Sequence, residues 1–414
     1  MTKYRSLLAV LACGAVVAAG CGSSKSTTAV TTAAPAAAAT TAAPAATTAA
    51  PAATTAAPAA TTAAPAATTA APAGDAGLAA AKAVVDKYSK ADGSIGVTKP
   101  LTKKPAKQTI AWLECELESC TYETVGMKAA TAALGWDLKI ISMKSGEPAP
   151  AFQQAIDANV NYIASSGLSY ALYKDQAIAA KAKGIKTVSC YDSATPPSED
   201  KNVYMQCGDT SFVQKTGPLM ADWAIVDSKS KANVLVVNIP DFSVLVAEVD
   251  AYKAEMKKNC ASCTVTDLNV TIDDLVGGKI AGKVASQLQS NPKLNYVFNS
   301  FGSLPLGLTA ALKTAGLDKQ VKVYGQDFSK PNLDEIVAGT MGAWSADPKA
   351  YAAWLMVDGA ARLSVGMPLD EERAAAALPT LLVSDAKLAK EISDVGGDWN
   401  PPGMDAAFKK LWGV

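Results

Sequence analysis

The side chains of this 414-residue chain that could do chemistry are cysteines and carboxylates, because the sequence contains no histidine. Without histidine, neither a Ser-His-Asp triad nor a Cys-His pair can form, and no histidine-based metal site is possible. Lys and Arg together number 38, as do Asp and Glu, so the chain lacks the basic excess that a nucleic-acid binder needs. We therefore expect no nucleic-acid partner, no metal and no cofactor.

Six cysteines follow residue 21, and their spacing predicts three local disulfides among the 15 connectivities that six cysteines allow. Cys190 and Cys207 end what should be adjacent parallel strands, about 4.8 Å apart, a separation that suits a disulfide. The other expected pairs are Cys115–Cys120, between a strand end and the next helix, and Cys260–Cys263, at a helix–strand turn.

The pair Cys260–Cys263 has two rival interpretations, a thioredoxin-like redox pair and half of a zinc site. Zinc needs four ligands, and a redox pair should begin a helix after a strand, whereas this pair follows a helix. Structural disulfides are therefore expected, and they indicate an exported, oxidising location.

The N-terminus has the pattern of an export signal. A basic start precedes the apolar run 6–20, which is shorter than the about 20 residues that a membrane span needs. The run ends in AAGC at 18–21, which resembles the lipobox of bacterial lipoproteins, although that motif prefers Leu or Val where this chain has Ala18. The resemblance implies cleavage after residue 20 and lipidation of Cys21. The alternative is a simple secretory signal with a cleavage site nearby.

Residues 21–77 are a low-complexity tether of Ala, Thr and Pro, in which a proline recurs every seven residues from Pro44 to Pro72. The repeat has no Leu or Ile to fill a coiled-coil seam, and proline interrupts an Ala-rich helix. Without large side chains this segment cannot form a core. In polyproline-like form, about 50 residues at ~3.1 Å each reach on the order of 150 Å, enough to carry a domain through a thick cell wall.

Residues 78–107 read as a short helix, 78–90, followed by a linker, and a regular alternation of strands and helices begins at Gln108. Strands are expected at 110–115, 138–143, 162–166, 187–191, 203–207, 234–239, 264–270, 296–299, 321–325 and 342–345. Helices between them include 122–134, 149–158, 171–183, 244–258, 279–289, 306–315 and 351–363. Buried strands alternating with helices predict an α/β fold of parallel sheets covered on both faces, and about 300 residues of this pattern predict two lobes.

Four stretches carry a resemblance to a known family: KGIKTVSCYDS at 183–193, VYMQCGDT at 203–210, VYGQDF at 323–328 and WSADP at 344–348. Their order and spacing resemble the type I solute-binding proteins of ABC importers, the ribose- and galactose-binding-like group. The resemblance implies two doubly wound parallel-sheet lobes with three interlobe crossings, near 209–210, 346 and 374–378. The first lobe would comprise 108–209 and 346–374, and the second 210–345 and 375–414.

In open α/β sheets, ligands bind at the carboxyl ends of the strands. Together with the resemblance, this rule makes Asp192 and Asp327 the leading ligand-binding candidates, one on each lobe. The remaining predicted ligand-binding residues are Tyr122, Tyr191, Glu114, Glu248, Phe301 and Asp241. Other strand-end residues have plainer interpretations, with Glu116 and Glu118 as solvated rim charges and Phe242 and Phe328 as core.

The sequence also departs from the family's sugar binders. Glu248 lies where they carry an Arg, Phe301-Gly302 where they carry Asn-Asp, and Ala346 where they carry a Gln. A sugar would lose several hydrogen bonds at these positions. The expected solute is therefore sugar-like or amine- or hydroxyl-bearing, and partly apolar. The surplus of acids near the cleft favours a cationic or donor-rich solute with an apolar or aromatic body over a plain pentose or hexose.

Taken with the resemblance, these features predict a monomeric, non-enzymatic receptor on the outer face of the cell membrane, in the periplasm or cell wall space. It would be held there by a lipid anchor alone and would deliver its solute to an ABC transporter permease. One alternative is a surface lipoprotein that passes its ligand state to a sensor kinase. The other is an enzyme on the same fold that uses Asp192 and Asp327 for acid–base catalysis.

Overall fold

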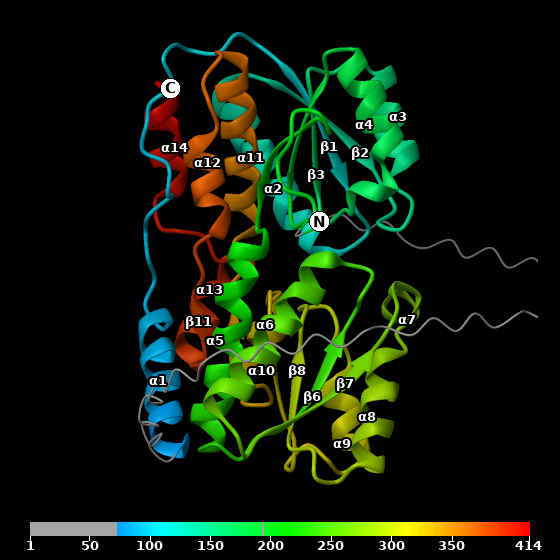
Figure 1. The fold of residues 1–414 in the computed structure, drawn as a ribbon, viewed down its shortest axis with the longest axis vertical. Coiled ribbons are helices and arrows are strands. Elements are labelled where there is room, and N and C mark those ends of the chain that lie inside the picture. The colour runs from blue at the N-terminus through cyan, green and yellow to red at the C-terminus, as the bar shows by residue number, and fades with distance from the viewer. Residues whose placement is uncertain (1–72, 193) are drawn as a thin grey trace, which may run out of the picture. The chain divides into compact units, whose positions relative to one another are not determined.

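The computed structural model describes residues 73–414 with the exception of position 193 (Figure 1). The expected signal segment, most of the expected tether and the expected lipidation site Cys21 lie outside the described residues. No helix in the described part of the chain is both long enough and apolar enough to cross a membrane.

The first lobe is built on a five-stranded, all-parallel sheet in the order β2-β1-β3-β4-β5. Its strands are β1 (Thr109–Glu114), β2 (Asp137–Ser142), β3 (Tyr162–Ser166), β4 (Lys186–Cys190) and β5 (Val203–Cys207). Its helices are α2 (Glu118–Leu134), α3 (Ala149–Asp157) and α4 (Lys174–Ala182), with a 3-10 turn, η1, at Tyr170–Leu172. Because β1, β3 and β4 are covered on both faces, they are buried along most of their length, whereas the edge strand β2 is mostly exposed.

The second lobe has a six-stranded sheet in the order β11-β10-β9-β8-β6-β7, parallel except for β11. Its strands are β6 (Asn233–Asn238), β7 (Thr264–Asn269), β8 (Tyr296–Asn299), β9 (Lys322–Gln326), β10 (Trp344–Ser345) and β11 (Leu382–Val383). Its helices are α5 (Thr210–Ser228), α6 (Ser243–Asn259), α7 (Ile272–Val276), α8 (Ile280–Ser290), α9 (Leu308–Thr314) and α10 (Lys330–Val337).

Alternate residues of β6 show that helices cover both faces of the second sheet. Val234 and Val236 belong to one apolar cluster with α5 and α6, while Leu235 and Val237 belong to another with α8, α9 and α10. The expected α/β class, with two doubly wound lobes, is confirmed, and every expected strand is present within a residue or two of its predicted bounds.

The chain passes between the lobes at each of the three expected places. It crosses between β5 and α5, between β10 and α11 (Lys349–Ser364), and between η2 (Ala375–Ala377) and β11. Helices α11 and α12 (Asp370–Ala374) pack on the first lobe, against β4 and β5. Lys215 of α5 donates hydrogen bonds to the carbonyls of Ala377 and Leu378, so the first and third crossings are joined to each other.

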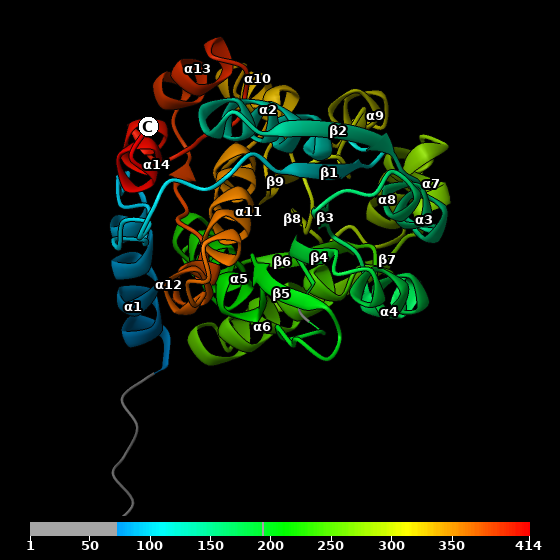
Figure 2. The same cartoon turned by 90° about the horizontal axis from the view of Figure 1, so that it is seen from above.

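The C-terminal helices divide between the lobes. Helix α13 (Ala386–Asp394) packs against α10, whereas α14 (Met404–Trp412) packs against α11 and α2 (Figure 2). The rings of Trp354, Phe408 and Trp412 stack together in this second contact. The expected assignment of all of 375–414 to the second lobe is therefore wrong for α14, since its apolar face is buried on the first. The remaining lobe boundaries stay a prediction.

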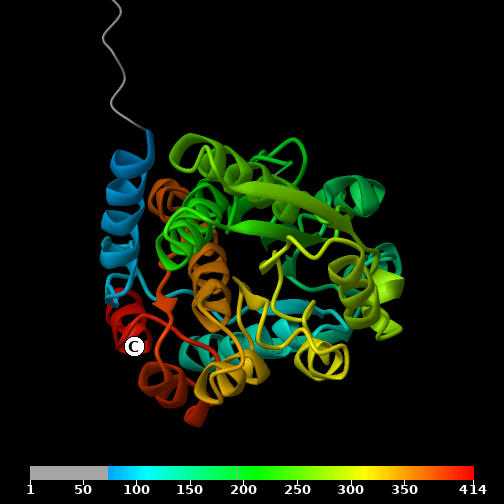
Figure 3. The same cartoon turned by 90° about the horizontal axis from the view of Figure 1, so that it is seen from below.

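The N-terminal helix α1 (Ala73–Tyr88) packs against α5 and α6 of the second lobe (Figures 1 and 3). The segment 89–107 then runs to β1 of the first lobe, so it is a further connection between the lobes, as is the segment 395–403 between α13 and α14, and the sequence predicted neither. The segment 89–107 is held by Tyr351 OH, which donates to the carbonyl of Ile95 (2.7 Å), and by Arg362, which donates to the carbonyl of Lys99 (2.8 Å).

Three disulfides are present, and they pair the cysteines as their spacing predicts: Cys115–Cys120, Cys190–Cys207 and Cys260–Cys263. Cys190 and Cys207 are register partners at the ends of β4 and β5, with their Cα atoms 4.3 Å apart. This disulfide therefore joins two strand ends at the edge of the sheet from which the chain crosses to the second lobe.

Candidate ligand-binding site between the lobes

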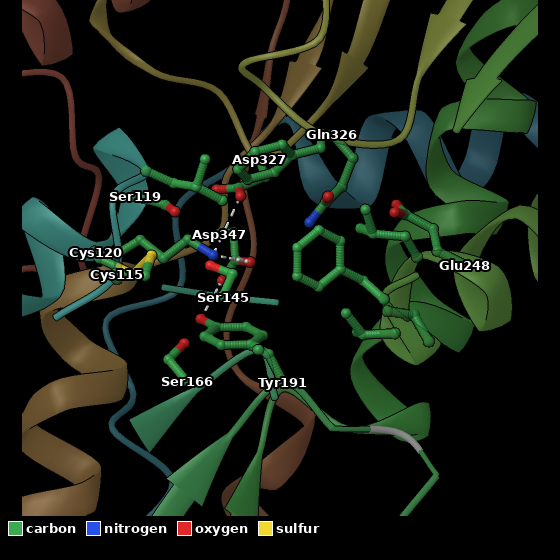
Figure 4. A pocket seen from close by; sticks show the side chains of 18 of the residues that line it. Cys115, Ser119, Cys120, Ser145, Ser166, Tyr191, Glu248, Gln326, Asp327 and Asp347 are labelled. Atoms are coloured by element: carbon green, nitrogen blue, oxygen red, sulfur yellow. Dashed lines mark hydrogen bonds and ion pairs between the residues drawn. A yellow bond between two sulfur atoms is a disulfide. The ribbon is translucent and has the colours of Figure 1, made fainter. Parts of the chain in front are cut away.

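A cleft of about 610 Å³, part of it open to solvent, lies between the carboxyl ends of the two sheets (Figure 4). It is lined by Cys115, Leu117, Ser119, Cys120, Ser145, Ser166, Gly167, Tyr191, Phe212, Val213, Phe242, Val244, Leu245, Glu248, Phe301, Gln326, Asp327, Asp347 and Lys349. Both lobes contribute side chains, because parallel strands present their ends, and the loops that follow them, at one edge of a sheet.

A buried lysine forms ion pairs with two of the cleft carboxylates. Lys349 Nζ lies 2.8 Å from Asp347 Oδ2 and 3.2 Å from Asp327 Oδ2, and its side chain is only 8% exposed. Asp347 lies in the crossing between β10 and α11, and Lys349 is the first residue of α11. Buried carboxylates without a cation would be costly in free energy. The crossing places the Lys349 ammonium between these two.

Tyr191 extends this charged cluster to the first lobe. Its hydroxyl donates a 2.5 Å hydrogen bond to Asp347 Oδ1, and the ammonium of Lys349 lies 4.0 Å from the centroid of its ring. The backbone of Tyr191 is in the left-handed region (φ 64°), which is uncommon for a bulky residue. Gly208 leaves room for the Tyr191 ring, since a Cβ at that position would collide with it.

Asp327 has the same unusual backbone on the second lobe (φ 60°). Tyr191 follows β4 and Asp327 follows β9, so each lobe directs one strained strand-end residue at Lys349. Strained backbone of this kind costs about 1–3 kcal/mol and concentrates at binding and active sites. The two residues therefore mark the functional end of each sheet.

Burial and ion pairing have opposing effects on these groups. Burial raises the pKa of Asp327 to about 7, against the opposing effect of the Lys349 ammonium. Burial lowers the pKa of Lys349, but the carboxylates of Asp327, Asp347 and Glu123 outweigh it and hold the pKa above its usual value. Lys349 is therefore charged at any physiological pH, and it favours the ionised form of its neighbours.

Glu123 of α2 lies behind this cluster and is fully buried. Burial raises the pKa of Glu123 to about 8, although the charge of Lys349 and a hydrogen bond with Ser166 act in the other direction. At neutral pH, this carboxyl is therefore mostly protonated and can donate a hydrogen bond as well as accept one.

The second-lobe side of the cleft is mainly aromatic and aliphatic, with Phe212, Phe242 and Phe301 among its lining residues. Glu248 of α6 lies among them with no exposed surface, and neither of its carboxyl oxygens has a hydrogen-bond partner among the described residues. Burial, together with the charges of Asp327 and Asp347, raises the pKa of Glu248 well above its usual value.

Four of the eight predicted ligand-binding residues line the cleft: Tyr191, Glu248, Phe301 and Asp327. They come from four separate segments, which the fold brings together. Their contact with a solute stays a prediction, but their common location supports it.

Two other predicted residues lie where the lobes meet. Asp192 accepts a 3.0 Å hydrogen bond from Ser243 Oγ at the start of α6, and a second from the backbone N–H of Ala194. Tyr122 OH donates to Glu118 (3.0 Å) and accepts from the backbone N–H of Lys330 on α10 (3.4 Å). In the described residues, neither side chain belongs to the lining of this cleft, and both connect the lobes. Tyr122 also lines a small adjoining hollow with Phe301 and Asp327, and contact of either side chain with a solute stays a prediction.

The last two predicted residues lie elsewhere. Glu114 accepts a 2.5 Å hydrogen bond from Thr124 Oγ1, which in turn accepts from Trp112, so its carboxylate serves the packing of α2 on β1. Asp241 is exposed and outside the lining that the structure describes. Both follow a strand, as expected, but the side chain that follows a strand need not turn toward the cleft.

The sequence did not single out Asp347, Lys349 or Gln326, all of which line the cleft. One signal was present: Asp347, within the WSADP match, and Lys349, directly after it, stand two residues apart at a crossing between lobes. A charged pair at a hinge would have marked them as candidates for the cleft.

Comparison with known proteins assigns the class. Residues 121–367, more than half of the chain, match the family described as "Periplasmic binding protein domain". This chain belongs to that family. A search of curated proteins found no match.

Solved structures with the same fold include several solute-binding proteins. A carbohydrate transporter from Acidothermus cellulolyticus 11B, in complex with myo-inositol, is 20% identical, with a TM-score of 0.57 over 70% of this chain and 98% of that one. An ABC transporter solute-binding protein from Agrobacterium vitis with bound allitol is 18% identical, with a TM-score of 0.59 over 70% and 99%. The 5-methylthioribose transporter solute-binding protein from Thermotoga lettingae is 17% identical, with a TM-score of 0.57 over 76% and 99%.

Proposed function

We propose that this protein is an extracytoplasmic receptor, anchored by a lipid on Cys21, that binds a small organic solute between its lobes and delivers it to an ABC importer permease. The observation that most directly supports this proposal is the set of residues that line the cleft. Its lining includes Tyr191 and Ser166 of the first lobe, and Asp327, Glu248 and Phe301 of the second.

A site divided between two lobes couples binding to closure, because a solute can contact both sets of residues only when the lobes are together. Asp192–Ser243 and Tyr122–Lys330 then add hydrogen bonds between the lobes themselves. Closure would give the permease a shape to recognise. The family membership and the solutes bound by proteins of the same fold support this function.

The direct test is to express the protein in a secreting host, purify it without denaturation, and release bound solutes for mass spectrometry. We expect one small organic compound at near-stoichiometric amount. Returning this compound to solute-free protein should reduce the radius of gyration measured by solution scattering. If no compound co-purifies, and a broad solute library neither raises the melting temperature nor compacts the protein, the receptor function is wrong.

A further inference from the structure

One carboxyl in the cleft has no positive partner. Among the described lining residues, the acids are Asp327, Asp347 and Glu248, and the cation is Lys349. Lys349 pairs with both aspartates, at 3.2 and 2.8 Å. No ion pair is formed by Glu248 within the described part of the chain, and neither of its oxygens accepts or donates a hydrogen bond there. The lysine therefore compensates the aspartates and leaves Glu248 to another group.

The surroundings of Glu248 make the lack of a partner costly in free energy. The residue is fully buried, and the side chains that share its side of the cleft are Phe212, Val213, Phe242, Leu245 and Phe301. Thr216 faces it from α5, but its hydroxyl is also without a hydrogen-bond partner among the described residues. A buried polar group without a partner costs about 1–3 kcal/mol, and an unpaired buried charge costs more. Figure 4 shows Glu248 on the opposite side of the cleft from Asp347, so Lys349 does not reach it.

We propose that the solute carries a protonated amine that binds Glu248, with its apolar part against the phenylalanine rings of the same side. This inference rests on the proposed receptor function and names the class of solute. Aromatic rings and a carboxylate are the two groups that attract an organic cation in a desolvated site, through the face of the ring and through a charged hydrogen bond. The hydroxyl and amide groups of Ser166, Ser145 and Gln326 remain for polar groups elsewhere on the solute.

Binding of an ammonium group to Glu248 should release a proton. In the free protein, burial and the neighbouring Asp327 and Asp347 raise the pKa of Glu248 well above its usual value, with Thr216 and Lys349 acting against them. These effects favour the protonated, neutral carboxyl. An ammonium group favours the ionised form, so binding transfers the Glu248 proton to the buffer and leaves a carboxylate–ammonium pair. A neutral alcohol would bind the protonated carboxyl and release no proton.

The test uses matched probes on the full chain. The amines are phenethylamine, cyclohexylamine and glucosamine, and their neutral partners are 2-phenylethanol, cyclohexanol and glucose. We expect at least one amine to raise the melting temperature and to bind at least tenfold more tightly than its neutral partner. Calorimetry of that amine at pH 7 in phosphate and in Tris should give different apparent enthalpies, since the two buffers differ in ionisation enthalpy and take up the released proton.

The matched variant is Glu248→Gln, which keeps the shape of the side chain and removes its charge. The free variant should melt at or above the wild-type temperature, because a neutral amide of the same shape replaces a buried acid that has no cation beside it among the described residues. Its affinity for the amine should fall about 10- to 150-fold, and the buffer dependence should disappear. Glu391→Gln, at an exposed carboxylate of α13 outside the cleft, should change neither.

Three outcomes would overturn the amine assignment. They are equal binding of an amine and its neutral partner, equal amine binding by Glu248→Gln, and failure of every amine to bind. Tight binding of a neutral probe, or of myo-inositol or allitol, would keep the receptor function while rejecting the amine. Only the absence of any bound or stabilising solute would count against both.

Discussion

Asp192 of the first lobe accepts a 3.0 Å hydrogen bond from Ser243 Oγ, at the N-terminus of α6 in the second lobe. The Asp192 side chain is 1% exposed. The bond crosses the gap between the lobes beside the cleft, so it exists only when the lobes are together. A hydrogen bond of this kind contributes to closure without contacting the solute.

Ser243→Ala removes this interlobe bond and leaves the bond of Asp192 with Ala194 in place. We expect affinity for the co-purified solute to fall about fivefold, which corresponds to about 1 kcal/mol. Calorimetry measures the affinity, and solution scattering measures closure. Ser262→Ala, far from the cleft on the Cys260–Cys263 turn, is the control. An unchanged affinity in Ser243→Ala would show that this bond does not contribute to closure.

Lys349→Met leaves Asp327 and Asp347 without their cation. Breaking a buried ion pair in this way costs about 3–5 kcal/mol, because two carboxylates remain buried and unpaired. Urea unfolding at pH 7 should show this loss. Lys330→Met is the control, since Lys330 pairs with Asp334 on the exposed surface of α10 and such pairs are worth at most about 1 kcal/mol. Equal losses in the two variants would contradict the assigned role of Lys349.

Glu123 gives a pH dependence with a definite sign. Its pKa is raised by burial to about 8, above its ordinary value of 4.5, so the folded protein holds this proton more tightly than the unfolded chain does. The resulting stabilisation is complete below pH 4.5 and is lost as the pH rises toward 8, by on the order of 1 kcal/mol per pH unit. The free energy of unfolding of Glu123→Gln should therefore decline less than that of wild type between pH 5 and 8. Parallel pH profiles would exclude Glu123 as the source.

The disulfides differ in the loops that they close. Cys190–Cys207 spans 17 residues, and Cys260–Cys263 spans 3. Replacing both cysteines of the first pair by alanine should lower the free energy of unfolding by about 3 kcal/mol, since the unfolded chain regains the entropy of a longer loop. The same change at Cys260 and Cys263 should cost less. The change at Cys260 and Cys263 should also leave solute affinity unchanged. The change at Cys190 and Cys207 should lower it, because it loosens the strand end that holds Tyr191, whose N–H donates to the carbonyl of Cys207 (2.6 Å). The reverse order of effects would contradict this account.

The proposed lipid anchor would be attached to Cys21 alone. Cys21→Ala should leave the precursor unprocessed or release the protein to the medium, because the acceptor of the lipid is lost. Fractionation with detergent-phase partitioning measures both outcomes. Continued membrane retention of a processed Cys21→Ala protein would contradict the lipobox interpretation.

Local features of this protein were determined by its sequence. A strand covered on both faces is buried along most of its length and is rich in apolar residues, and the apolar residues of β1, β3, β4, β6 and β8 predicted the positions of these strands. The Cys190–Cys207 pairing followed as well, because two neighbouring parallel strands must end side by side. The resemblance added the order of the lobes and placed two of the cleft acids, Glu248 and Asp327.

Only the tertiary structure decided how these strand ends are used. Asp192 and Asp327 follow equivalent strands, yet the first bonds to the opposite lobe while the second turns to Lys349, because each direction depends on which element of the other lobe lies nearby. The local sequence does not predict that Lys349 pairs with two carboxylates, or that Glu248 has no cation beside it in the described part of the chain. The same holds for α14. Its amphipathic pattern does not show which lobe it packs on, and in the structure Trp412 of this helix stacks on Trp354 of α11. These are contacts between distant segments, and their energies appear only when the chain is folded.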